Sequence, residues 1–209
     1  MTQILILYYS QGGSVAEMAQ YFSRGVESVE NCEGSLRTVP PIRTTTQTIE
    51  SDIPESGPPY VTCNDLVNCD GLALGSPTRF GNMAAPIKYF IDSTSDVWIS
   101  GGLVGKPATV FSSTGSLHGG QETTLLSMML PLIHHGMLLI GLPYTEPGLF
   151  EKEGGGTPYG ATHVAGEKND LPVTKKEKEL SFAAGKRFAT IAKKLKNLNG
   201  LPRKFNKNS

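Results

Sequence analysis

The sequence predicts a doubly wound α/β protein, with helices on both faces of a parallel sheet, and two observations support this fold class. Short apolar runs of strand length alternate with segments whose apolar residues recur at helical spacing. Such alternation is typical of a parallel β-sheet. Loops rich in Gly, Ser and Thr follow three of the runs, and in this kind of sheet they meet at the carboxyl edge of the strands, where ligands bind.

The first predicted unit is a strand, a short polar loop and a helix. Residues 3–9 are almost continuously apolar, which is typical of a central strand buried on both faces. Ser14 and Glu17 have the spacing of a capping box, so we expect the helix to begin at Ser14. Its apolar residues recur at helical spacing and are Val15, Met18, Ala19, Phe22 and Val26.

Four more strands complete a predicted five-stranded sheet. Their apolar runs occupy residues 36–39, 71–75, 108–112 and 137–142. The intervening and following helices are predicted around residues 66–67, 85–91, 125–134 and 174–198. The last helix opens with a second capping box, formed by Thr174 and Glu177.

Two long segments show no periodicity. Residues 40–62 are rich in Pro, Thr and Ser, and residues 143–173 are rich in Gly and Pro. Loops of this length in a compact domain are usually functional or insertions. We expect one domain over residues 1–200, followed by a basic tail at residues 201–209.

Composition narrows the possible partners. The 209 residues include 19 Lys and Arg and 19 Asp and Glu, so the net charge is zero and no nucleic acid partner is indicated. The three cysteines have neither disulfide nor zinc spacing, and no metal site is predicted. No signal peptide and no apolar run of spanning length are present, so we expect a cytoplasmic protein without membrane insertion.

The three loops carry the candidate binding residues. Loop 10–15 offers hydroxyls, backbone N–H groups and a helix N-terminus, which together can bind a phosphate. Loop 77–82 can hydrogen-bond the polar edge of a heterocycle, and the small residues of loop 113–120 let the backbone approach a flat ligand. The residues are Ser10, Gln11, Gly12, Gly13, Ser14 and Val15, then Pro77, Thr78, Arg79, Phe80, Gly81 and Asn82, then Ser113, Thr114 and Gly115.

Each of these features also has an interpretation without a ligand. Loop 10–15 could be a plain strand–helix turn, Phe80 could belong to the core, and Arg79 could pair with a surface carboxylate. Trp98, the single tryptophan, is by residue type more often a core residue than a ligand contact. His134 could simply cap the carboxyl end of a helix. The convergence of three loops on one edge favours ligand binding.

Several catalytic motifs are absent from the sequence. It contains neither the dinucleotide-binding G-x-G-x-x-G nor a P-loop. It also lacks a nucleophile elbow, and no paired carboxylates occur in the three loops. These absences argue against hydrolysis and for chemistry carried by a cofactor.

Several runs resemble the WrbA-type NAD(P)H:quinone oxidoreductases. They are Leu-Ile-Leu-Tyr-Tyr-Ser (5–10), Gly-Ser-Pro-Thr-Arg-Phe-Gly-Asn-Met (75–83), Val-Phe-Ser-Ser-Thr-Gly (110–115), His-His-Gly-Met (134–137) and Gly-Gly-Thr-Pro-Tyr-Gly-Ala-Thr (155–162). The resemblance extends from about residue 3 to residue 198. It implies a flavodoxin-like fold with sheet order 2-1-3-4-5, one FMN per subunit and a homotetramer.

The resemblance also implies residue roles. Loop 10–15 would hold the FMN phosphate, and residues 78–80 and 113–118 would surround the isoalloxazine. The second of these ranges adds Ser116, Leu117 and His118 to the candidate binding residues. The catalytic residue would be His134, which would approach the flavin of a neighbouring subunit and stabilise its reduced form or supply a proton to the substrate. Trp98 and Tyr144 would line the substrate space. Two departures from the family pattern are Gly12, where an aromatic residue that touches the nicotinamide is usual, and Leu117-His118, where glycines are usual.

The function that the resemblance implies is two-electron reduction of a quinone to a hydroquinone. NADH or NADPH would reduce the flavin and leave before the quinone binds, in a ping-pong mechanism. Two alternatives remain open: a flavodoxin-type electron carrier without a substrate of its own, and a non-enzymatic interaction protein. Electron carriers of the flavodoxin type tend to be strongly acidic, whereas this chain is neutral.

Overall fold

The computed structural model describes residues 1–42, 54 and 56–197. At its centre is a parallel sheet whose strands are β1 (Thr2–Tyr8), β2 (Cys32–Thr38), β3 (Gly71–Arg79), β5 (Pro107–Thr114) and β6 (Leu138–Leu139). They are arranged in the order β2-β1-β3-β5-β6, so the predicted order 2-1-3-4-5 is confirmed. Two short strands extend this sheet: β4 (Asn82–Met83) pairs antiparallel with the end of β3, and β7 (Thr162–Val164) pairs parallel with β5.

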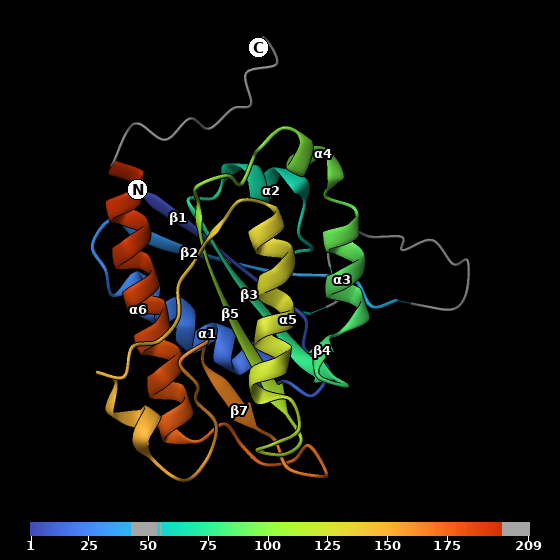
Figure 1. Ribbon diagram of the computed structural model, residues 1–209, viewed down its shortest axis with the longest axis vertical. Coiled ribbons are helices and arrows are strands. Elements are labelled where there is room, and N and C mark those ends of the chain that lie inside the picture. Colours follow the sequence, from blue (N-terminus) through green and yellow to red (C-terminus); the bar gives the residue numbers. More distant parts are fainter. Residues whose placement is uncertain (43–53, 55, 198–209) are drawn as a thin grey trace.

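Helices cover both faces of the sheet, as Figure 1 shows. One face packs against α1 (Ser14–Glu27) and α6 (Lys175–Asn197). The other packs against α2 (Cys63–Asn68), α3 (Ala85–Asp92), α4 (Ser95–Ile99) and α5 (Gln121–His134). A 3-10 turn, η1 (Pro147–Phe150), contacts α6. The predicted doubly wound, flavodoxin-like class is therefore confirmed.

The central strands are buried on both faces. In β3, Leu72 and Leu74 join the core under α3 and α5, whereas Ala73 joins the core under α1 and α6. Successive side chains of a strand point to opposite faces, so both faces need apolar residues. This explains the continuous apolar runs from which the strands were predicted.

Two glycines set the close packing of α1 on α6. A Cβ at Gly25 would lie 2.1 Å from the carbonyl oxygen of Phe182, and a Cβ at Gly185 would lie 2.1 Å from the carbonyl oxygen of Phe22. Each glycine therefore lets the backbone of the other helix approach to a distance that no side chain permits.

The two predicted capping boxes have different outcomes. The one at Ser14 is wrong: Gly13, at φ 90°, is the N-cap of α1, and Ser14 is already helical. A left-handed glycine there turns the chain into the helix without a side-chain cap. The second box is confirmed, because Thr174 N–H donates to Glu177 at 2.8 Å and Glu177 N–H donates to Thr174 Oγ1 at 3.3 Å.

The strand beside β5 differs from the prediction, which placed a single strand at residues 137–142. β6 covers only residues 138–139 and pairs with the first two residues of β5. The last three residues of β5 pair instead with β7, which lies inside the segment predicted as the loop 143–173. Two short strands thus share the edge of β5. The sequence signal failed because β7 has only three residues.

Residues 43–53 and 55 of the predicted loop 40–62, and the predicted tail 201–209, lie outside the described residues. The second strand begins four residues before its predicted start, at Cys32. Its sequence is mostly polar because it is an edge strand, paired with β1 along one side.

Candidate functional site

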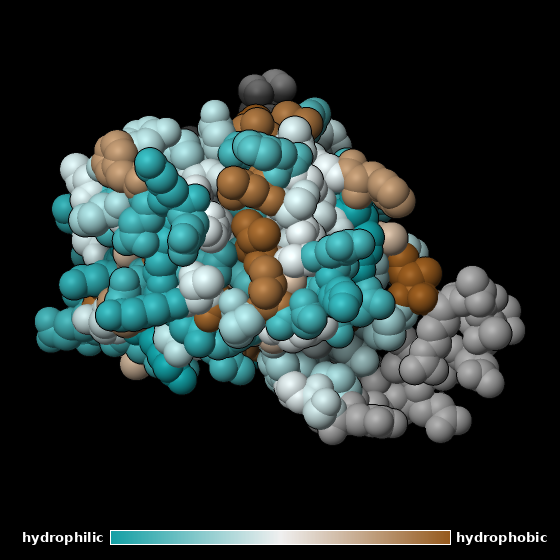
Figure 2. All heavy atoms as spheres, turned by 90° about the horizontal axis from the view of Figure 1, so that it is seen from below, coloured by the Kyte–Doolittle hydropathy of each residue, from teal (hydrophilic) through white to brown (hydrophobic). Residues whose placement is uncertain are grey.

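A pocket of about 490 Å³ lies at the carboxyl ends of β1, β3 and β5. All three predicted loops contribute to it, together with a fourth loop that follows β7. The lining residues are Ser10, Gln11, Gly12, Ser14, Val15, Pro77, Thr78, Arg79, Ser113, Thr114, Gly115, Gly166, Glu167 and Asn169. Figure 2 looks onto this end of the molecule, which is largely hydrophilic with an apolar strip across the middle.

Loop 10–15 is built to receive an anion. Ser10 Oγ accepts the N–H of Gly13 at 3.1 Å, which fixes the turn into α1. The first intrahelical bond runs from Glu17 N–H to the Gly13 carbonyl at 2.9 Å. The N–H groups before Glu17 therefore have no intrahelical acceptor, and the helix dipole makes this end attractive to a phosphate.

Loop 77–82 is the tight connection between β3 and β4. Phe80 at its tip has φ 52°, a region that bulky residues rarely adopt, and its side chain is fully exposed. The interpretation of Phe80 as a core residue is therefore wrong. Thr78 Oγ1 accepts the N–H of Gly81 at 3.2 Å and the hydroxyl of Thr124 at 2.8 Å, which holds the loop against α5.

Arg79 crosses from loop 77–82 to loop 10–15. One guanidinium nitrogen donates to the carbonyl of Thr78 at 2.8 Å, and another donates to the side-chain oxygen of Gln11. None of the described residues forms an ion pair with Arg79, so the expected alternative of a surface ion pair is not what the structure shows. Its positive charge lies at the rim of the pocket.

Loop 113–120 packs closely against loop 77–82. Gly120 has φ 107°, and a Cβ there would lie 2.9 Å from Thr78 Oγ1. Thr114 Oγ1 accepts from Gln121 Nε2 at 2.6 Å and donates to the Ser116 carbonyl at 2.8 Å. These bonds orient Thr114, and its neighbour Ser113 lines the pocket.

The fourth loop was missed by the sequence analysis. Gly166, Glu167 and Asn169 come from the predicted loop 143–173, and the strand that delivers them was not predicted. Asn169 has φ 55°, and a Cβ at Gly12 would lie 2.1 Å from its Nδ2. The side chain of Asn169 therefore occupies the space that any side chain at position 12 would need. The one available signal was the turn-forming composition of residues 166–170.

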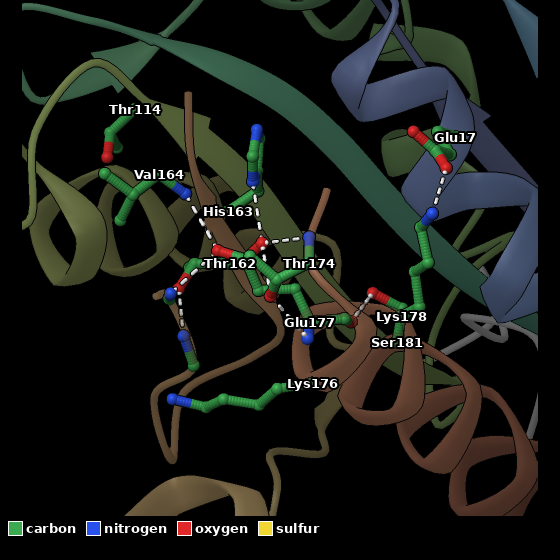
Figure 3. A network of polar contacts seen from close by, with 12 residues as sticks. Glu17, Thr114, Thr162, His163, Val164, Thr174, Lys176, Glu177, Lys178 and Ser181 are labelled. Atoms are coloured by element: carbon green, nitrogen blue, oxygen red, sulfur yellow. Dashed lines mark hydrogen bonds and ion pairs between the residues drawn. The ribbon is translucent and has the colours of Figure 1, made fainter. Parts of the chain in front are cut away.

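A buried carboxylate anchors this fourth loop (Figure 3). Glu177, on the first turn of α6, accepts hydrogen bonds from five donors. They are the N–H of Gly155 (2.8 Å), the N–H of Val164 (3.0 Å), the N–H and hydroxyl of Thr174 (2.8 and 2.9 Å) and Nδ1 of His163 (2.9 Å). Burial raises the pKa of Glu177, but the hydrogen bonds from His163 and the three backbone groups outweigh it and lower that pKa to about 2.

His134 and Trp98 lie together, but not at the pocket. Trp98 Nε1 donates to the carbonyl of His134 at 2.9 Å, and the Trp98 side chain is 55% exposed, so the core expectation from residue type is wrong. His134 is the last residue of α5, whose other end begins at loop 113–120. The 14 residues of α5 span about 20 Å, so His134 does not reach the pocket of its own chain.

The structure does not bring the other predicted residues into the pocket lining. Tyr144 packs beside Phe150, with ring centroids 5.7 Å apart. Asn82 lines a neighbouring hollow. The remaining predicted residues outside the lining are Gly13, Phe80, Gly81, Ser116, Leu117 and His118.

The pocket fits FMN. Its volume lies within the usual range for sites of small ligands and cofactors. One end offers a helix N-terminus and serine hydroxyls for a phosphate, and the rest offers small residues and backbone groups for a flat ring. Within the described residues, no group of His, Cys, Asp and Glu could hold a metal, and no helix is long and apolar enough to cross a membrane.

Fold and pocket together define a flavodoxin-like protein with a pocket at the carboxyl edge of its sheet. A family model described as NADPH-dependent FMN reductase matches residues 3–145. A protein of Solidesulfovibrio magneticus named NAD(P)H dehydrogenase (quinone) is 40% identical over 202 residues, which cover 92% of this chain and 98% of that protein. The chain therefore belongs to the NADPH-dependent FMN reductase family, which bears out its WrbA-type resemblance. It is an FMN-dependent oxidoreductase.

Solved structures show the same fold. A WrbA-like flavodoxin from Agrobacterium tumefaciens superposes with a TM-score of 0.67 at 21% identity, covering 93% of this chain and 99% of that chain. A flavodoxin from the Archaea superposes with a TM-score of 0.61 at 18% identity, covering 92% and 99%.

Proposed function

We propose that this chain is an NAD(P)H:quinone oxidoreductase that reduces quinones to hydroquinones by two-electron transfer. The observation that carries the proposal is the convergence of four loops on a pocket with a helix N-terminus at one end. The 40% identical relative with the name NAD(P)H dehydrogenase (quinone) supports the choice of donor and acceptor. Bound FMN supplies the redox chemistry, since it exchanges electrons with both a nicotinamide and a quinone.

Different residues of the pocket bind different parts of the cofactor. Ser10, Ser14 and the N–H groups at the start of α1 hold the phosphate. Thr78 and Arg79 bind the polar edge of the ring, and Ser113 to Gly115 bring small residues and backbone against it. Phe80 lies exposed at the tip of loop 77–82, where it can cover an apolar edge of the ring.

A second copy of the chain completes the site. Leu126, Leu130 and Ile133 share one face of α5 at helical spacing and are 42%, 61% and 52% exposed. Trp98 and Ile99 are both 55% exposed on the neighbouring α4. We propose that this apolar face packs against other copies in a homotetramer, and that His134 and Trp98 thereby reach a neighbouring pocket. Leu130→Lys should dissociate the assembly in sedimentation measurements.

The test of the main proposal uses the purified protein. Its visible spectrum should show bound flavin, NADH should bleach that spectrum under nitrogen, and benzoquinone should restore it. Steady turnover with NAD(P)H and benzoquinone should give parallel double-reciprocal lines, as a ping-pong mechanism requires. A flavin that bleaches without turnover would indicate the electron carrier, and a colourless protein that does not take up FMN would indicate the interaction protein.

The role of His134 has a separate test. His134→Ala should slow reoxidation by benzoquinone while NADH still bleaches the flavin. If both half-reactions keep their wild-type rates, His134 has no part in the chemistry.

A further inference from the structure

A second hollow, of about 720 Å³, opens beside the cofactor pocket. The two share Gln11 and Arg79, whose side chains are hydrogen-bonded to each other. Arg79 therefore forms part of both walls, and a ligand long enough to occupy both hollows would pass this pair.

The lining of the second hollow combines aromatic, apolar and charged groups. Tyr9, at the end of β1, and Tyr89, on α3, contribute the aromatic rings, and Tyr89 is 69% exposed. Ile42, which is exposed, adds apolar surface to the lining. An exposed ring such as that of Tyr89 can stack with a nucleobase.

The charges of this lining favour an anion. Among the described residues of this lining, Arg79 and Lys88 are cationic and Asp92 is acidic, which gives these residues a net charge of +1. Lys88 Nζ lies 2.7 Å from Asp92, but both side chains are more than half exposed. Ion pairs in that position contribute little, so Lys88 can turn to a phosphate without a large loss.

The loop that follows β7 lies close to loops 10–15 and 113–120. Asn169 packs over Gly12, and a Cβ at Gly115 would lie 3.5 Å from the carbonyl of Gly166. The loop that contains Gly166 and Asn169 thus lines the pocket together with loops 10–15 and 113–120. The second hollow shares Gln11 and Arg79 with this pocket, so an extended ligand bound to the pocket can continue past Arg79.

We infer that this hollow is the binding site for the adenosine diphosphate half of NAD(P)H. The inference rests on the proposed function, because it places the donor whose nicotinamide must reach the pocket. The diphosphate lies near Arg79 and Lys88, and the adenine lies against Tyr89.

The test compares two hydride donors that differ only in this half. NADH carries the adenosine diphosphate, whereas dihydronicotinamide riboside lacks it. With the FMN-loaded enzyme under nitrogen, flavin bleaching is followed as a function of donor concentration. Tyr89→Ala should raise the half-saturating concentration of NADH about five-fold or more, as expected for loss of a base–aromatic stack, and should leave that of the riboside unchanged.

Two further variants sharpen the comparison. Tyr89→Phe keeps the ring and should behave as the wild type with both donors. Tyr21→Ala removes an aromatic side chain from α1, on the opposite face of the sheet, and should change neither value. Equal effects of Tyr89→Ala on both donors, or no effect on either, would refute the site while leaving the proposed function intact. Failure of the wild type to bleach with either donor would overturn the proposed function, and this inference with it.

Discussion

Replacing Glu177 by Gln should be among the most damaging isosteric changes in this protein. The carboxylate accepts five hydrogen bonds, two on Oε1 and three on Oε2. An amide keeps only one accepting oxygen, so at least two of the five donors lose their acceptor whichever way it is turned. Each orphaned donor costs roughly 1–3 kcal/mol, which gives a loss of about 2–6 kcal/mol. That is a large part of the stability of a typical domain.

Chemical denaturation at pH 7 measures this loss directly. Glu179→Gln is the matched control, because Glu179 lies on the same helix with a largely exposed side chain and a 3.7 Å contact to Lys175, and it should change stability by less than about 0.5 kcal/mol. If Glu177→Gln loses no more than this control, the five bonds do not stabilise the fold as argued.

The same carboxylate makes stability depend on pH. The pKa of Glu177 is about 2 in the folded protein against an ordinary 4.5, so the folded state favours the ionised form. Its contribution is complete above about pH 4.5 and is lost as the pH falls towards 2. The difference corresponds to about 3 kcal/mol. Glu177→Gln should flatten the pH dependence of unfolding in that window, and an unchanged slope would contradict the assignment.

Three other changes have definite expected outcomes. Gly185→Ala places a methyl group 2.1 Å from the Phe22 carbonyl and should lower the unfolding free energy by roughly 1–3 kcal/mol, measured by denaturant titration. Phe80→Ala removes a fully exposed ring, so thermal unfolding should stay unchanged while FMN affinity, measured by fluorescence quenching, falls. Gly12→Ala must displace Asn169, and we expect weaker FMN binding that the added Asn169→Ala change partly restores; an unchanged dissociation constant would mean that Asn169 moves aside at no cost.

Most of the sheet could be predicted because its central strands are buried on both faces. The apolar run at residues 3–9 overlaps all but the first residue of β1, and the runs at residues 71–75 and 108–112 fall within β3 and β5. The edge positions were harder, because an edge strand such as β2 needs fewer apolar residues. β7, with three residues, is too short for any periodicity to appear.

The candidate site, like the sheet, could be predicted in part, because a loop could be recognised only where the strand before it had a strong sequence signal. Loops 10–15, 77–82 and 113–120 follow strands with strong signals, and residues from each line the pocket. Loop 166–169 follows β7, so its place at the pocket could not be recognised.

The capping box of α6 connects the fold with the candidate site. From the sequence, Thr174 and Glu177 indicate only where a helix begins. In the structure the same carboxylate also accepts hydrogen bonds from the N–H groups of Gly155 and Val164. Gly155 precedes β7 in the chain, and Val164 is the last residue of β7. β7 pairs with only three residues of β5, so the ladder alone holds it weakly. The buried Glu177 supplies the missing constraint, and through β7 it fixes the loop that carries Asn169 to the pocket. A helix cap has thereby become a support of the cofactor site, and the cofactor affinity of Glu177→Gln should fall along with its stability.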